Sequence, residues 1–102
     1  MSFTQENAAT IIAQLGGNKF RMMTGAKNFV FSTTDKNLSM RIGRNGNKIN
    51  FVRVTLTDAD LYDVEYGYVR GMNYTVRATE SGIYCDMLRG SFERNTGMAT
   101  SL

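Results

Sequence analysis

The sequence predicts an α+β fold: an antiparallel β-meander of about five to six strands flanked by an N-terminal and a C-terminal helix. Apolar residues recur at helical spacing near both ends of the chain, and between them they alternate with polar residues in short runs. Turns of a few residues join these runs, too short for the crossovers that parallel strands need. The chain of 102 residues therefore suits one domain, residues 1–102, with one hydrophobic core.

The first helix is predicted over residues 5–15. Thr4 precedes it and is a favourable N-cap residue. Its apolar stripe consists of Ala8, Ile11, Ile12 and Leu15. Gly16 and Gly17 then end the helix, because glycine adopts the left-handed conformation without a steric cost.

Six strands are predicted beyond this helix, where the apolar period changes to two. They cover residues 19–24, 28–33, 38–44, 49–57, 61–70 and 74–79. The clearest alternation is in the third run, where Leu38, Met40 and Ile42 share one face. Proline, which often protects sheet edges from pairing, is absent from the chain, so a strand-mediated homodimer is left open.

The C-terminal helix is predicted over residues 83–94. Helical spacing places Ile83, Met87, Leu88, Ser91 and Phe92 on one stripe of this helix. Gly90 opposes the helix by about 1 kcal/mol relative to alanine. The sequence Asn-Thr-Gly that ends at Gly97 supplies a helix stop.

The residue types argue against an enzyme. The chain contains no histidine, which excludes Ser-His-Asp and Cys-His catalytic systems. The glycine-containing segments LGGNK, TGAKN and GRNGNK match neither a P-loop nor a dinucleotide-binding motif. Asp58, Asp60 and Asp63 are interpreted as a polar turn rather than a cation site. We therefore expect no catalytic residue, no cofactor and no bound metal.

The chain is expected to be cytoplasmic and not to enter a membrane. No apolar stretch approaches the roughly 18–20 residues that span a bilayer, and the N-terminal residues lack the basic leader of a secretion signal. The single cysteine, Cys85, has no partner for an internal disulfide, which suits a reducing compartment.

Charge is segregated along the chain. The formal net charge is +3, but residues 19–53 hold eight basic residues against one acid, Asp35. Phenylalanines are interleaved with these cations, a combination that holds nucleic acid through phosphate contacts and base stacking. The candidate nucleic-acid-binding residues are Lys27, Arg41, Arg44, Lys48, Arg53, Phe29 and Phe31. In the alternative interpretation, the phenylalanines point into the core and the cations form a solvated face.

A second candidate surface lies in the acidic, tyrosine-rich half of the chain. Tyrosine is enriched at protein interfaces because it combines apolar area with a hydroxyl group. The protein-binding residues of this alternative are Tyr62, Tyr66, Tyr68, Asp58 and Asp60. A core face with the hydroxyls at its rim explains the same tyrosines, since tyrosine is also a strong strand former.

Four strings carry a resemblance to known sequences. LGGNKFRMMTGAKNF, INFVRVTL, DLYDVEYGYVRG and FERNTGMATSL together resemble a family of small uncharacterised bacteriophage and prophage proteins. The resemblance implies expression in a bacterial cytoplasm and transfers no site residue. We therefore expect a non-enzymatic phage-type accessory protein that binds nucleic acid. The alternative is an adaptor or anti-CRISPR-like inhibitor that binds a host or phage protein.

Overall fold

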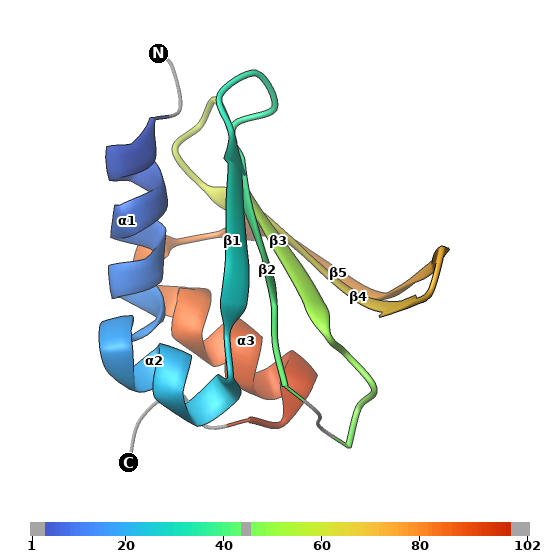
Figure 1. Cartoon of the computed structure of the whole chain (residues 1–102). Helices are drawn as coiled ribbons and strands as arrows, with labels where there is room; N and C mark the ends of the chain where they lie inside the picture. Colours follow the sequence, from blue (N-terminus) through green and yellow to red (C-terminus); the bar gives the residue numbers. More distant parts are fainter. Residues whose placement is uncertain (1–3, 44–45, 99–102) are drawn as a thin grey trace.

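The fold is a five-stranded antiparallel sheet whose helices all lie on one side (Figure 1). The structure is a computed structural model that describes residues 4–43 and 46–98. Its elements are α1 (Gln5–Leu15), α2 (Gly17–Thr24), β1 (Lys27–Ser32), β2 (Asn37–Arg41), β3 (Phe51–Leu56), β4 (Tyr62–Arg70), β5 (Asn73–Ile83), the 3₁₀ turn η1 (Cys85–Met87) and α3 (Leu88–Thr96). The strand order β1-β2-β3-β4-β5 confirms the predicted α+β meander.

The core lies between the sheet and the three helices. Alternate residues of the central strands point toward the helices and are buried; they are Leu38, Met40, Val52, Val54, Val64 and Tyr66. The helices contribute Ile11, Leu15, Phe20, Leu88 and Phe92. The rings of Phe20 and Phe92 meet edge to face with centroids 5.0 Å apart, which joins α2 to α3. None of the described helices lies on the opposite face of the sheet (Figure 1).

The expected strand over residues 19–24 is wrong, because this segment forms the helix α2. Phe20 and Thr24 are its buried residues, four positions apart, whereas Met22 between them is exposed. The Thr24 hydroxyl donates to the Phe20 carbonyl at 2.6 Å, which is a helical hydrogen bond. Gly25 then ends α2 in the left-handed conformation.

The C-terminal helix begins later than expected. Residues 83–94 were predicted to be helical, but β5 continues to Ile83 and α3 starts at Leu88. Ile83 is buried and pairs with Tyr62 of β4, so its contribution to the core is made from a strand. The remaining predicted strands correspond to β1 to β5, with their ends shifted by a few residues.

A carboxylate anchors α3 to the sheet. Glu80 of β5 accepts hydrogen bonds from the Ser91 hydroxyl at 3.0 Å, from Arg94 at 2.5 Å, and from Asn95. Burial opposes ionisation of Glu80, but the hydrogen bonds from these three residues outweigh it and lower its pKa. The hydroxyl groups of Tyr66 and Ser91 are hydrogen-bonded to each other at 2.8 Å. This bond links the Glu80 anchor to the buried core.

Replacing Glu80 by Gln is expected to lower the free energy of unfolding by about 1–3 kcal/mol, because charge-assisted hydrogen bonds are weakened. Denaturant titration at neutral pH measures the loss. Since the folded state lowers the Glu80 pKa, this stabilisation is present above the ordinary value of 4.5 and is lost as the pH falls through the folded-state value. The difference between E80Q and the wild-type protein should therefore shrink in acid.

The matched control is Glu6→Gln, which changes an exposed carboxylate in the first turn of α1. Its free energy of unfolding should change by less than about 0.5 kcal/mol. Equal losses in the two variants would contradict the anchoring role of Glu80.

Candidate functional site

A basic cavity of about 850 Å³ opens at one end of the sheet. It is lined by residues from the start of β1, the end of β2, the segment before β3 and the end of β4: Gly25, Lys27, Asn28, Arg41, Ile42, Gly43, Lys48, Ile49, Asn50, Tyr68 and Arg70. These residues meet because of the meander. In such a sheet, the odd-numbered strands begin at the same end of the sheet as that at which the even-numbered strands finish.

Hydrogen bonds to backbone groups fix the walls of the cavity. The Gly43 amide donates to the Thr24 carbonyl at 2.7 Å, which ties the end of β2 to the turn after α2. The Asn50 side chain donates to the Val69 carbonyl at 2.8 Å and accepts from the Val69 amide at 2.7 Å. This side chain therefore extends the β3–β4 ladder beyond the strand and holds the segment before β3 against β4.

Four cations line the cavity, and the described residues give none of them a neutralising partner. Lys27, Arg41, Lys48 and Arg70 come from four separate segments. No Asp or Glu is among the described lining residues, and within residues 4–43 and 46–98 none of the four forms an ion pair. Uncompensated positive charge in a concave site attracts anions, since the low-dielectric walls focus the field.

Three cations away from the cavity are neutralised by carboxylates. Lys36 pairs with Asp58 at 3.1 Å, and Arg53 pairs with Glu65 at 3.4 Å. Arg94 pairs with Glu80 at 2.5 Å. Lys19, Arg21 and Arg77 also form no ion pair within the described residues, but they do not line the cavity. The four cavity cations are therefore distinguished by their convergence on one cavity.

The cavity residues are arranged at a local cost to stability. Lys27 and Arg41 are direct partners across β1 and β2, and like charges in that position repel one another. Asn28 and Lys48 both have left-handed backbones, with φ of 56° and 55°. This conformation is disfavoured for most residues with a side chain, although Lys36 and Asp60 adopt it as well in turns outside the cavity.

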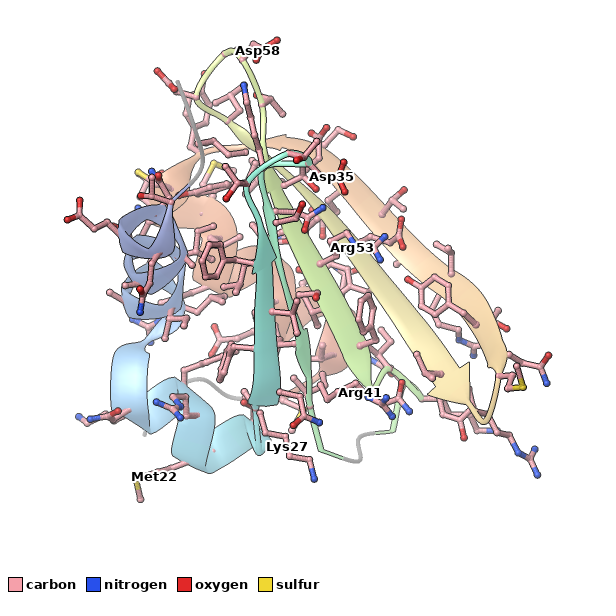
Figure 2. The ribbon with its side chains drawn as sticks, turned by 45° about the horizontal axis from the view of Figure 1, so that its top comes forward. Met22, Lys27, Asp35, Arg41, Arg53 and Asp58 are labelled. Atoms are coloured by element: carbon pink, nitrogen blue, oxygen red, sulfur yellow. The ribbon has the colours of Figure 1, made fainter. Side chains whose placement is uncertain are left out.

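The two ends of the sheet carry opposite charge. In Figure 2, Lys27 and Arg41 lie toward the lower end, Arg53 lies midway, and Asp35 and Asp58 lie at the upper end. The upper end is where β1 turns into β2 and β3 turns into β4. A polyanion approaching the protein is therefore drawn to the cavity end and repelled from the other.

Of the five cations predicted to contact nucleic acid, the structure brings three together. Lys27, Arg41 and Lys48 line the cavity. Arg44 lies outside the described residues. Arg53 lies on the uncovered face of β3, where it pairs with Glu65 and stacks 5.2 Å from the centroid of the Phe51 ring.

The two phenylalanines predicted to stack on bases lie away from the cavity. Phe29 is half-buried against the core, with the Arg21 guanidinium 5.3 Å from its ring centroid. Phe31 pairs with Leu38, which places it on the helix-covered face of the edge strand β1. It is 42% exposed there. Neither ring lines the cavity.

The residues of the protein-binding alternative do not share one surface. Tyr62 and Tyr66 are buried, and Tyr62 donates its hydroxyl hydrogen bond to Gln14 at 2.7 Å. Burial raises the pKa of Tyr66 to about 12. Asp58 and Asp60 are exposed in the loop after β3, at the end of the sheet opposite Tyr68.

Sequence reasoning missed Arg70 as a site residue and assigned Tyr68 to a different surface. Both belong to the half of the chain that looks acidic in the linear sequence. The signal that identifies them is topological: Arg70 ends β4, and the ends of even-numbered strands meet the starts of odd-numbered ones.

An aromatic cluster occupies the uncovered face beyond the cavity. The Tyr74 ring lies over Gly67, where an added Cβ would collide with it, and meets Phe51 edge to face with centroids 5.4 Å apart. The Tyr74 hydroxyl donates to Glu65 at 2.5 Å. Burial and the contact with Glu65 raise the pKa of Tyr74 to about 12. Arg53 and Glu65 belong to this cluster, because Arg53 lies over the Phe51 ring and pairs with Glu65.

Comparison with protein-family models, with curated proteins and with solved structures gives no match. Within the described part of the chain, no helix is long and apolar enough to cross a membrane. The same residues contain no group of three or more Cys, Asp or Glu placed to hold a metal ion.

Replacing Arg41 by Gln is expected to raise the free energy of unfolding by about 0.2–1 kcal/mol at low salt, because repulsion with Lys27 is relieved. Thermal unfolding at low and high salt measures the effect, which should shrink as salt screens the two charges. The matched control is Arg53→Gln, which breaks the pair with Glu65 and should lower stability. A loss of stability in R41Q equal to that in R53Q would show that Arg41 has a structural role.

Proposed function

We propose that this protein is a small, non-enzymatic accessory protein that binds nucleic acid through the basic cavity. One observation carries the proposal: four cations from separate segments converge on a cavity whose described lining contains no carboxylate. Three of them, Lys27, Arg41 and Lys48, were expected on sequence grounds to contact phosphates. Arg70 joins them through the fold.

The arrangement suits a polyphosphate better than a single small anion. The four cations are distributed around a cavity of about 850 Å³. Successive phosphates of a nucleic-acid strand supply several negative charges at spaced positions, and each contact releases condensed counterions. Affinity gained in this way is sequence-independent, because contacts to phosphates carry no information about the bases.

The biological setting of the proposal is supported by sequence alone. The four strings that resemble bacteriophage and prophage proteins indicate a phage-type protein acting in the cytoplasm of a bacterial host. The single cysteine, Cys85, is compatible with that reducing compartment.

A second candidate function is inhibition of a host defence protein, or another adaptor role. The observation in its favour is the exposed apolar surface of the β4–β5 hairpin, where Met72, Tyr74 and Val76 are all more than one-third exposed. Apolar groups gathered on a protruding hairpin are typical of protein-binding surfaces. A pull-down from a bacterial host should then recover one stoichiometric protein, and loss of that protein with Val76→Glu would support this function.

The nucleic-acid proposal predicts a steep dependence of binding on salt. Fluorescence anisotropy with labelled DNA and RNA oligonucleotides, single- and double-stranded, should show the logarithm of affinity falling with the logarithm of salt concentration. A slope of about −3 is expected for four contacts with a single strand. The double substitution Lys27→Ala and Arg41→Ala should weaken single-strand binding at least about tenfold and bring the slope closer to zero by about 1.4.

The matched control is the double substitution Lys36→Ala and Arg53→Ala. It removes the same net charge from cations that are paired with Asp58 and Glu65 away from the cavity. Its affinity should stay within about threefold of the wild-type value, since salt screens charges beyond about 10 Å. Equal weakening by both pairs, or no binding to any of these oligonucleotides at low salt, would overturn the proposal.

A further inference from the structure

We infer that the cavity takes single-stranded nucleic acid, with one unpaired base held against the ring of Tyr68 while the flanking phosphates contact the surrounding cations. This inference rests on the proposed function and names the form of nucleic acid that the site accepts. It assigns Tyr68 a role in nucleic-acid binding, whereas sequence reasoning placed it on a protein-binding surface.

Tyr68 differs from the other tyrosines of the β4–β5 hairpin in having an unused hydroxyl. The hydroxyl groups of Tyr62, Tyr66 and Tyr74 bond to Gln14, Ser91 and Glu65 respectively. Tyr68 is half-buried, yet in the described part of the chain its hydroxyl has no hydrogen-bond partner. It is the only aromatic side chain among the described residues that line the cavity.

Tyr68 lies beside a cation in the same cavity. Residues two positions apart in a strand point to the same face, so the ring of Tyr68 and the guanidinium of Arg70 project together from the end of β4. Lys27 and Arg41 line the same cavity from β1 and β2, but they lie on the sheet face of Phe51 and Gly67, opposite to that of Tyr68. Phosphates on either side of the base therefore reach Arg70 on one face and Lys27 and Arg41 on the other, around the end of the sheet. An aromatic surface bordered by cations is the arrangement that single-strand-binding proteins use for a base and its phosphates.

The size of the cavity favours a nucleotide over a phosphate alone. About 850 Å³ lies in the range of pockets that enclose small organic ligands. A duplex keeps its bases paired and stacked inside a cylinder, so its phosphates reach only the rim of such a cavity. A single strand turns an unpaired base into the cavity without breaking any pair.

The first test compares a twenty-nucleotide oligothymidine with a duplex of the same length by anisotropy at low salt, using Tyr68→Leu and Tyr68→Phe. Wild-type protein should bind the single strand at least about tenfold tighter than the duplex. Tyr68→Leu should weaken single-strand binding about tenfold, the effect of losing one stacked base, and leave duplex binding unchanged. Tyr68→Phe retains the ring and should bind within about threefold of wild type.

The matched control is Tyr84→Leu, which removes a tyrosine that is 60% exposed and does not line the cavity. It should leave both affinities unchanged. Equal weakening by Tyr68→Leu and Tyr84→Leu would overturn the inference, because it would show a general effect of losing a tyrosine.

A second test uses the unaltered protein and does not depend on how the variants fold. Oligothymidine carrying 5-iodouracil is irradiated in complex with the protein, and the cross-linked peptide is identified by mass spectrometry. A cross-link at Tyr68 supports the inference. Cross-links confined to other aromatic residues, such as Phe31 or Tyr74, overturn it.

The outcomes separate the two proposals. If single strand and duplex bind equally and Tyr68→Leu changes neither affinity, while the Lys27 and Arg41 substitutions weaken both, the single-strand inference fails and the proposed function stands. If neither form binds at low salt, both fail.

Discussion

The burial of one sheet face beneath three short helices is the constraint on which the rest of this structure depends. Residues such as Val54 and Tyr66 alternate along each strand with residues of the opposite face, so covering one face leaves the other to solvent. The Glu80 anchor holds the last helix in place over the buried face. The cavity forms at the end of the sheet, where the residues of neighbouring strands and of the turn after α2 meet.

The sequence predicts the fold class because its apolar period is strong in most elements. α1 spans the predicted residues 5–15, since its buried side chains keep strict helical spacing. α2 was missed because Phe20, Met22 and Thr24 also fit a strand, and eight residues offer too few turns to decide between the two periods. Packing of Phe20 on Phe92 of α3, a contact between distant parts of the chain, favours the helix.

The candidate site is only partly predictable from the sequence, because the cations that are close together in the sequence are not all close together in the structure. Lys27, Arg41 and Lys48 belong both to the linear cluster in the sequence and to the spatial cluster at the cavity. Arg53 belongs to the linear cluster alone, since its position in the middle of β3 places it beside Glu65 on the uncovered face. Arg70 belongs to the spatial cluster alone, because β4 returns the chain to the end of the sheet where the other cations lie. Once the meander is recognised, the rule that even-numbered strands end where odd-numbered strands begin brings Arg70 together with Lys27 and Arg41.

The agreement between strand order and chain order also bears on how the protein folds. Each strand pairs with its neighbour in sequence, so the sheet forms hairpin by hairpin and each step closes a short loop at a small entropic cost. The contact between α1 and α3 is different, because it joins the two ends of the chain. α3 also packs on β5, so the C-terminal helix closes the core that the sheet and the other helices leave open. Because Leu88 and Phe92 of α3 are fully buried, a core without this helix would expose Phe20 and the strand residues beneath it, so the integrity of the whole core depends on its C-terminal helix.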